Sequence, residues 1–187
     1  MKVGILALQG DFREHGFVLA DAGATPVEVR TPEQLTEVEA LVIPGGESTA
    51  IGRLARLYGL VEPIRERARE GMPMLGTCAG MIVMAERVEG GEPLLSLLDL
   101  TVRRNAYGRQ VDSFETDIDV EGVGEVRGVF IRAPWVDEVG DGVRVLGEHD
   151  GRPVVLEQGN LVVCAFHPEL ARDPRLHEYL LRKVGER

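Results

Sequence analysis

Short strand-like segments, most of them entirely apolar, recur along the first half of the chain and alternate with amphipathic stretches. The strand-like segments lie at 3–8, 27–29, 40–43 and 72–76. Apolar spacing and stop signals predict helices at about 13–22, 48–58, 62–70 and 79–86. A further helix is expected to start at Thr31 and Pro32, as N-cap and first helical residue. This alternation favours a parallel sheet with helices on both faces.

The second half of the chain changes character, because strand-like segments follow one another without helices between them. Six candidates, separated by Gly and Asp turns, lie at 100–104, 115–120, 128–132, 143–148, 153–158 and 161–166. Asp150-Gly151 predicts a tight hairpin, and a last helix is expected at 174–184. We therefore expect an α/β three-layer sandwich, whose mostly parallel central sheet is flanked by helices and carries antiparallel strand additions. No repeat or linker divides residues 1–187, so a single domain is expected.

Composition is that of a globular protein, and the charge narrows the range of partners. The chain has 44% hydrophobic and 28% charged residues, and 21 basic against 31 acidic residues give a net charge of −10. An acidic surface repels phosphate backbones, so a nucleic acid partner is not expected. We find no apolar run of membrane-spanning length and no signal-peptide pattern, so we expect a cytoplasmic protein with reduced thiols and no membrane association.

The segment Gly76-Thr77-Cys78-Ala79-Gly80 lies between a predicted strand and a predicted helix, which is the context of a nucleophile elbow. Glycines two positions either side of Cys78 remove side chains that would clash in such a sharp turn. The first amides of the helix would favour a thiolate, and the Ala79 N–H is placed to stabilise an oxyanion. A buried core cysteine in a βα turn is the structural alternative. The other cysteine, Cys164, is interpreted as a core residue, and no metal site is expected.

A cysteine nucleophile requires a general base, and the chain has four histidines. His167 directly follows the last predicted strand, at the kind of strand end where open α/β sheets place ligands. It would transfer the proton, and Glu169 would orient its ring. His149 and His177 are expected to be solvated, and a local role for His15 stays open.

The loop Pro44-Gly45-Gly46-Glu47-Ser48 follows the third predicted strand. Its two glycines would let backbone N–H groups approach a ligand closely. The loop lacks the lysine and the spacing of a phosphate-binding loop. A tight turn with Ser48 as N-cap of the next helix is the structural alternative, and both interpretations can hold together.

Together, the elbow, the His-x-Glu sequence and the Pro-Gly-Gly loop resemble those of class I, triad-type glutamine amidotransferases. The resemblance is closer still to one branch of that family, the glutaminase subunits of pyridoxal 5′-phosphate synthase. Besides these motifs, it rests on residues 8–10, 13–15, 104–114, 130–134 and 166–170. The pieces span nearly the whole chain, so the ordered set is much more specific than the elbow alone.

The resemblance implies a role for each site residue. Cys78 attacks the side-chain amide of L-glutamine, and His167, oriented by Glu169, protonates the departing ammonia. Water then hydrolyses the glutamyl thioester with His167 as base. The implied oxyanion-hole residues are Gly45, Gly46, Ala79 and Gln9, and the implied glutamine-binding residues are Gly46, Glu47, Ser48, Arg104, Ile131 and Arg132. The planar guanidinium of Arg104 suits a substrate carboxylate.

The resemblance also implies a partner, a (β/α)₈-barrel synthase subunit that accepts the ammonia within a large hetero-oligomer. Pyridoxal 5′-phosphate is then the product of the complex, and this chain needs no cofactor. We expect the partner to organise the loop at Gly45-Gly46, because a glutaminase active alone would waste glutamine. Three alternatives stay open: a glutaminase subunit of another pathway such as histidine biosynthesis, a γ-glutamyl hydrolase active without a partner, and a non-catalytic binding module.

Overall fold

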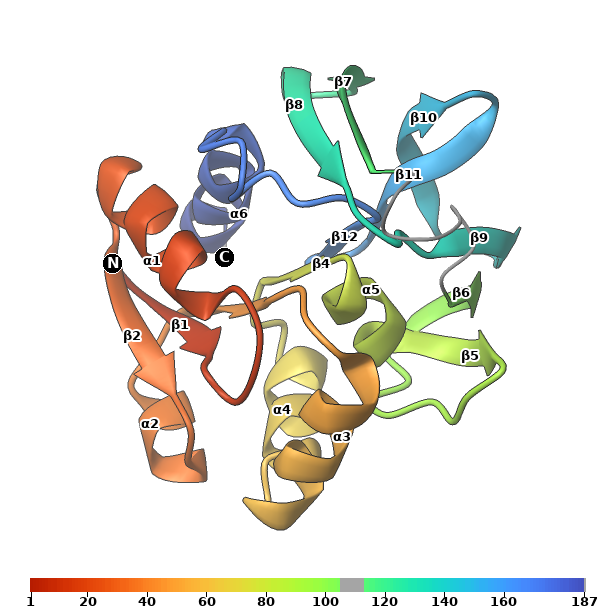
Figure 1. Cartoon of the computed structure of the whole chain (residues 1–187). Helices are drawn as coiled ribbons and strands as arrows, with labels where there is room; N and C mark the ends of the chain where they lie inside the picture. Colours follow the sequence, from red (N-terminus) through yellow and green to blue (C-terminus); the bar gives the residue numbers. More distant parts are fainter. Residues whose placement is uncertain (105–112, 187) are drawn as a thin grey trace.

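The computed structural model describes residues 1–104 and 113–186, and a seven-stranded sheet forms its centre (Figure 1). The strands run in the order β10-β11-β12-β4-β3-β1-β2. The parallel part consists of β1 (Lys2–Leu6), β2 (Thr25–Val29), β3 (Ala40–Ile43), β4 (Met74–Thr77) and β12 (Leu161–Cys164). Antiparallel strands extend one edge, namely β11 (Arg152–Gln158) and β10 (Arg144–His149). The innermost strands β3, β4 and β12 are buried at every position, because both of their faces are covered.

Helices cover both faces of the sheet (Figure 1). On one face α1 (Phe12–Asp21) lies beside α6 (Arg175–Gly185). The other face carries α2 (Pro32–Thr36), α3 (Ser48–Leu57) and α4 (Val61–Arg69), and α5 (Ala79–Met84) packs beside α3. This confirms the expected α/β fold with a mostly parallel sheet. None of the helices in the described part of the chain is long and apolar enough to cross a membrane.

The strand order reverses between β1 and β3, and the ends of these strands lie side by side. The chain crosses from β1 outward to β2, whereas it crosses from β3 in the opposite direction to β4. Ligands bind at such a reversal in open α/β sheets, beyond the carboxyl ends of the strands. Here the loops after β1 and β3 are joined by a hydrogen bond from the Asp11 N–H to the Gly45 carbonyl, at 3.1 Å. The topology therefore brings four strand ends, those of β1, β3, β4 and β12, to one edge.

Two smaller sheets complete the described fold. One contains β5 (Ala85–Glu89), β6 (Leu98–Arg103) and β9 (Trp135–Val139), and the other pairs β7 (Phe114–Val120) with β8 (Gly124–Phe130). The sequence patterns predict neither β5 nor β9, and the helix expected at 79–86 ends at Met84. β5 is mostly exposed, and its Arg87 reaches Thr101 and Asp99 of β6 at 2.8 and 2.7 Å. Its partner strand, more than its own apolar pattern, fixes its conformation.

Three strands end two residues earlier than their apolar patterns predict. β1 ends at Leu6 and not at residue 8, and β12 ends at Cys164 and not at residue 166. β8 ends at Phe130, because Arg132 has a positive φ of 45° that cannot continue a strand. The residues that follow these early ends form the loops of the site described below.

Two local predictions are confirmed by the backbone. Thr31 caps α2 in a capping box, in which its hydroxyl accepts from the Gln34 N–H and the Gln34 side chain accepts from the Thr31 N–H. Asp150 and Gly151 connect β10 to β11 with positive φ angles of 50° and 72°. Positive φ at both central residues is the requirement of a tight type I′ hairpin turn.

The N-cap of α3 is a correction. The structural alternative for the Pro-Gly-Gly loop had Ser48 in this position, but Ser48 is already the first helical residue and Glu47 is the cap. The Glu47 carboxylate accepts from the N–H groups of Thr49 at 3.0 Å and Ala50 at 2.8 Å. A longer carboxylate side chain can satisfy two helix amides at once, which outweighs the usual preference for serine.

The two glycines of the elbow lie where a side chain has no room. A Cβ atom at Gly80 would stand 2.1 Å from the carbonyl oxygen of Ile43 on β3. A Cβ atom at Gly76 would stand 2.9 Å from the backbone of Gly80 and 2.7 Å from the Met84 sulfur. Atoms this close must move apart, so these glycines let β3, β4 and α5 approach one another.

We expect Gly80→Ala to lower the free energy of unfolding by about 2–3 kcal/mol, because the added methyl group meets backbone and not a flexible side chain. Gly16→Ala is the matched control, since Gly16 also lies in a helix and its nearest neighbour to a Cβ atom is 3.7 Å away. That substitution should be neutral or stabilise by up to about 1 kcal/mol. Urea unfolding of the two variants measures the difference, and equal free energies would contradict the prediction.

Candidate active site

Cys78 stands at the turn between β4 and α5 with φ of 49° and ψ of −104°. A non-glycine residue in such a conformation stores about 1–3 kcal/mol of strain and persists only where its surroundings hold it. The Cys78 N–H is held by the Cys164 carbonyl at 2.9 Å. The side chain is 7% exposed and opens into a pocket, so this turn has the geometry of a nucleophile elbow. Cys164 itself is fully buried, as expected of a core residue.

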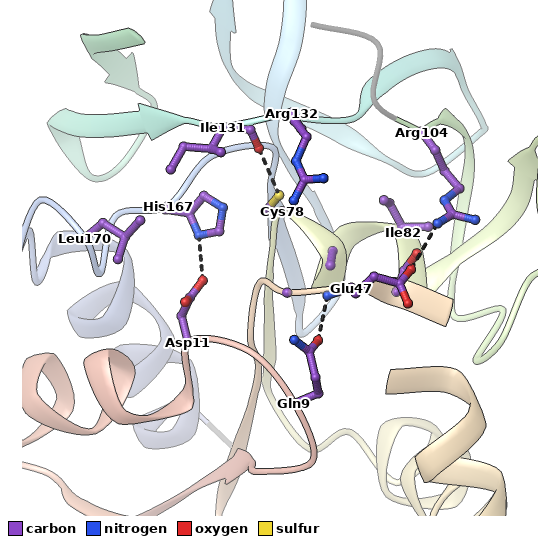
Figure 2. Close-up of a pocket in the computed structure, with 13 residues that line it drawn as sticks. Gln9, Asp11, Glu47, Cys78, Ile82, Arg104, Ile131, Arg132, His167 and Leu170 are labelled. Atoms are coloured by element: carbon purple, nitrogen blue, oxygen red, sulfur yellow. Dashed lines mark hydrogen bonds and ion pairs between the residues drawn. The ribbon is translucent and has the colours of Figure 1, made fainter. Parts of the chain in front are cut away.

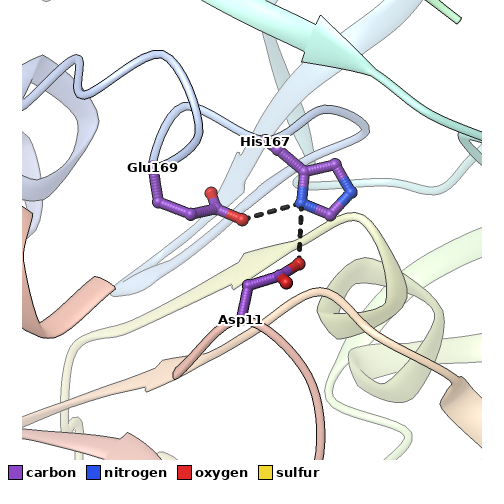
Figure 3. A group of neighbouring side chains, drawn as sticks. All are labelled: Asp11, His167 and Glu169. Atoms are coloured by element: carbon purple, nitrogen blue, oxygen red, sulfur yellow. Dashed lines mark hydrogen bonds and ion pairs between the residues drawn. The ribbon is translucent and has the colours of Figure 1, made fainter. Parts of the chain in front are cut away.

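His167 follows β12 and is anchored to β8 by two backbone hydrogen bonds with Val129, at 2.8 and 3.4 Å. Its Nδ1 lies 2.7 Å from Oε1 of Glu169 and 3.3 Å from Oδ2 of Asp11 (Figure 3). Since Nδ1 is engaged by the carboxylates, the other ring nitrogen is left for the Cys78 side chain, which lines the same pocket. Sγ of Cys78 donates to the Ile131 carbonyl at 3.9 Å (Figure 2). The arrangement has the order of a triad, with a nucleophile, a base and an orienting carboxylate.

The partners of His167 raise its pKa against the effect of burial. Burial lowers the pKa of this imidazole, but hydrogen bonds with Asp11, Cys78 and Glu169 outweigh it and place the pKa well above its usual value. Burial raises the pKa of Glu169, and the hydrogen bond with His167 opposes that rise. An imidazolium beside Cys78 is the arrangement that stabilises a thiolate there.

Asp11 belongs to this cluster, although the sequence patterns do not single it out. It stands directly before α1, where an aspartate is ordinarily interpreted as a helix cap. Its proximity to His167 depends on a contact between residues 156 positions apart, which no local pattern records. The available signal is its place in the loop after the first strand, next to Gln9, at the reversal of strand order.

Asp11, His167 and Glu169 are also the only described side chains grouped closely enough to hold a metal ion (Figure 3). Their ligand atoms lie within 4.8 Å of one another. Both carboxylates lie at hydrogen-bonding distance from the same ring nitrogen, so one shared proton already accounts for the grouping. We therefore interpret it as a hydrogen-bonded cluster.

The loop after β3 lies directly against the His167 ring. A Cβ atom at Gly45 would stand 2.3 Å from Cε1 of His167, so only glycine fits there. The Gly45 N–H donates to the Thr77 hydroxyl at 3.1 Å, which leaves it unavailable to an oxyanion in this arrangement. Gln9 accepts from the Glu47 N–H at 2.6 Å and braces the loop. Ala79 is the first residue of α5, so its N–H has no acceptor within the helix.

A pocket of about 410 Å³ opens in front of Cys78 (Figure 2). All six residues expected to bind glutamine line it, namely Gly46, Glu47, Ser48, Arg104, Ile131 and Arg132. Gln9, Ala79, Cys78 and His167 line it as well, whereas Glu169 lies behind His167 and is only 2% exposed. Three lining residues fall outside the sequence predictions, namely Asp11, Ile82 and Leu170.

Charges of both signs meet at one end of the pocket. Nη2 of Arg104 lies 3.2 Å from Oε1 of Glu47, the residue that also caps α3 (Figure 2). Partial burial acts to raise the pKa of Glu47, but hydrogen bonds from Thr49 and Ala50 and the charge of Arg104 keep it below its usual value. Such a pair is complementary to a small zwitterion, which carries a carboxylate and an ammonium group.

Two histidines form a buried network behind the triad. His177 was expected to be solvated, but it is fully buried against α1, with its Nε2 2.8 Å from Nδ1 of His15. Nε2 of His15 lies 3.1 Å from the Thr77 hydroxyl and 3.5 Å from Oε2 of Glu169. Burial, followed by the charges of other histidines, lowers the pKa of His15, so this ring is neutral. His149, also expected to be solvated, is half-buried against two phenylalanine rings.

Part of the segment 104–114 lies outside the described residues. Arg104 and the residues from 113 onward are described, whereas 105–112 are not, so the structure contributes nothing on this part of the family resemblance. Each piece of the resemblance except 13–15 contributes at least one residue to the lining of the pocket, namely Gln9, Gly46, Glu47, Ser48, Cys78, Ala79, Arg104, Ile131, Arg132, His167 and Leu170.

Known proteins resemble this chain over almost its whole length. A sequence model of the SNO glutamine amidotransferase family matches residues 5–186. Pyridoxal 5′-phosphate synthase subunit PdxT of Streptomyces avermitilis is 55% identical over 180 residues, which cover 94% of this chain and 90% of that protein. The protein of the same name from Pelotomaculum thermopropionicum is 54% identical over 186 residues, with 98% and 95% covered.

Two solved structures also superpose on this chain over almost its whole length. The crystal structure of a glutamine amidotransferase superposes with a TM-score of 0.94 at 50% identity, covering 98% of both chains. A structure of PurLQS from Thermotoga maritima gives a TM-score of 0.75 at 18% identity, again covering 98% of both chains. The second similarity is one of fold alone.

We expect the free energy of unfolding to fall as the pH drops from about 6.5 toward 4, because burial lowers the pKa of His177 to about 4. Between these values the unfolded chain binds a proton that the folded chain excludes. The contribution is complete above the unfolded pKa, and about 3 kcal/mol is lost across the window. Urea unfolding at stepped pH, for the wild type and His177→Gln, measures it. Parallel curves for the two proteins would show that His177 is not responsible.

Proposed function

The chain belongs to the SNO glutamine amidotransferase family, and on that premise we propose that it hydrolyses L-glutamine to L-glutamate and ammonia. The ammonia is supplied to a pyridoxal 5′-phosphate synthase subunit, in keeping with the names of its relatives. One observation carries the proposal at the level of residues, the buried pair of His167 and Glu169 against Cys78 at the wall of an open pocket.

Cys78 is the nucleophile in this proposal. The imidazolium of His167 stabilises its thiolate, which attacks the side-chain amide carbon of glutamine and forms a tetrahedral intermediate. The strained backbone of Cys78 holds the sulfur at the pocket wall without a search among conformers. As the intermediate collapses, the C–N bond breaks and His167 gives its proton to the departing ammonia.

The resulting glutamyl thioester is then hydrolysed. Neutral His167 takes a proton from water, and the hydroxide attacks the thioester carbon. The product leaves as its γ-carboxylic acid while the thiolate is restored beside the imidazolium, and the acid then loses its proton to solvent to give glutamate. Glu169 acts through Nδ1, at 2.7 Å, and keeps the ring in the tautomer whose other nitrogen faces the reaction. Proton and charge balance across the two steps without a metal or cofactor.

Arg104 and Glu47 recognise the backbone end of glutamine. Arg104 is suited to the substrate carboxylate, and Glu47 offers the opposite charge to the substrate ammonium group. Ile131 and Arg132 also line the pocket, and the Ile131 carbonyl accepts from Sγ of Cys78 at 3.9 Å. Glutamine, as a zwitterion, would be held at both charges while its side-chain amide reaches Cys78.

A synthase partner is required for full activity in this proposal. The Gly45 N–H is occupied by Thr77, so the loop offers fewer donors to an oxyanion than Ala79 and Gly45-Gly46 could provide together. Docking of the barrel subunit would reorganise this loop within a hetero-oligomer. We infer a cytoplasmic setting, since both cysteines are free thiols and the nucleophile depends on one of them.

Replacement of either reacting residue should abolish glutamate release. We expect Cys78→Ala and His167→Asn each to lower kcat/KM by at least roughly a thousandfold, because the nucleophile or its proton carrier is missing. Cys164→Ala is the control, since it also removes a buried thiol but does not line the pocket. Glutamate release from L-glutamine, measured with the synthase subunit present, should survive only in that control. Near wild-type turnover in either site variant would sink the mechanism.

Glutaminase activity should rise when the barrel synthase is added to the wild-type chain. We expect an increase of roughly a hundredfold or more in kcat/KM, the size of gaining one oxyanion donor. The same assay run with increasing synthase subunit measures it. Equal turnover with and without the synthase would contradict the partner-dependent loop and favour an independent hydrolase.

A further inference from the structure

We propose that Asp11 is a second carboxylate of the catalytic base, a positioning residue that shares Nδ1 of His167 with Glu169 and can replace it as the group that fixes the tautomer. The proposal rests on the proposed function of His167. It adds a residue from the first loop of the chain to a base assembled at its last strand.

The two carboxylates reach the same nitrogen from different elements (Figure 3). Oε1 of Glu169 is 2.7 Å from Nδ1, and Oδ2 of Asp11 is 3.3 Å from it. Nδ1 carries one N–H, so the shorter contact with Glu169 takes most of the hydrogen bond. Asp11 contributes mainly by its charge, and it lies close enough to accept the N–H if Glu169 no longer can.

The Asp11 side chain does not cap its helix, although aspartate commonly does so in this position. Asp11 is the N-cap of α1, yet its side chain makes no capping hydrogen bond. A cap of this kind is worth about 1 kcal/mol to a helix. Its N–H meanwhile donates to the Gly45 carbonyl at 3.1 Å, and Oδ2 would lie 3.3 Å from a Cβ atom at Gly45. Backbone and side chain together direct this residue toward the base and away from its own helix.

The two carboxylates differ in burial, so they act on His167 in different ways. The Glu169 side chain is fully buried, and burial raises its pKa. Asp11 is 34% exposed and lines the substrate pocket, so its charge keeps part of its hydration. Glu169 thus supplies a precise hydrogen bond, and Asp11 supplies a negative charge on the solvent side of the ring.

The ionisable groups that face His167 come from four segments of the described chain. They are Glu169 from its own segment, Asp11 from the loop after β1, Cys78 from the elbow and the buried His15 from α1. Of these groups, Asp11 and Glu169 direct carboxylate oxygens toward Nδ1. Removing either should lower the pKa of His167, and removing both should free Nδ1 from its proton.

A second carboxylate at Nδ1 should keep His167 out of the wrong tautomer when Glu169 is replaced. When a triad carboxylate is replaced by an amide, the amide N–H can donate to Nδ1 and drive the imidazole proton to the nitrogen that must act as base. In Glu169→Gln the carboxylate of Asp11 still requires an N–H at Nδ1. The reactive tautomer is therefore kept, and the loss of activity is smaller than a triad with one carboxylate would suffer.

Titration of His167 tests the charge of Asp11 directly. The His167 ring is followed by NMR in full-length Cys78→Ala, so that no thiol titrates with it, and the resonance is assigned by its loss in His167→Asn. Adding Asp11→Asn should move the His167 midpoint to lower pH, because one stabilising negative charge is gone. Asp21→Asn is the matched control, with the same charge change at the exposed far end of α1, and should leave the midpoint in place.

A double-mutant cycle tests the replacement of Glu169 by Asp11. With the synthase subunit present, Asp11→Asn and Glu169→Gln should each lower kcat/KM by roughly tenfold, because one carboxylate remains. The double variant should lose roughly 10⁴-fold, far more than the hundredfold product of the single effects. Circular dichroism and the urea midpoint establish that each variant is folded.

An unmoved His167 midpoint in the Asp11→Asn protein overturns the proposal, as does a double variant no worse than the product of the singles. Failure of the proposed function has a different signature. If the wild-type complex does not hydrolyse glutamine, the reaction assigned to the site is wrong, whereas the NMR titration still reports whether Asp11 holds the proton on His167.

Discussion

Direct contact between the backbone of α5 at Gly80 and the Ile43 carbonyl of β3 sets how closely the nucleophile turn approaches the loop beside it. Close backbone contact recurs through the site. The loop that follows Ile43 brings Gly45 against the ring of His167, and the Cys78 N–H is held by β12. The side chains of the site therefore meet because glycine backbone lies directly against neighbouring elements, where an added side chain would force them apart. This tight packing also holds the strained conformation of Cys78 in place.

Burial alone does not decide which histidine is charged. His15 and His167 are both almost wholly enclosed, yet the pKa of His15 is lowered and that of His167 is raised. The difference lies in the partners. His15 is hydrogen-bonded to another histidine and a hydroxyl and has one carboxylate at 3.5 Å, whereas His167 has one carboxylate at 2.7 Å and a second at 3.3 Å. Neighbouring groups whose environments drive their pKa values apart are typical of acid–base sites.

The sequence predicts the elements of the site better than their assembly. Cys78, His167 and Glu169 lie in short motifs whose glycines and strand context are visible locally, and the alternation of strands and helices predicts the parallel sheet. The sequence patterns do not identify Asp11, because its partner is 156 positions away and its own position is that of an ordinary helix cap. His177 is assigned wrongly for a similar reason. It is polar on an amphipathic helix, and only the facing His15 of α1 makes its burial acceptable. β5 escapes because a ladder partner can determine a strand that its own residues do not.

Because of the hydrogen bond between Asp11 and Gly45, the short loop after β1 contacts both the loop after β3 and His167. The backbone of Asp11 holds the Gly45 carbonyl, and its carboxylate faces the catalytic imidazole. A displacement of residues 9–11 would therefore change the shape of the oxyanion loop and the proton affinity of the base in the same movement. In engineering terms, the proposed function therefore implies that the pH optimum and the dependence on a partner are not separate adjustable traits. A substitution selected for one would carry a change in the other.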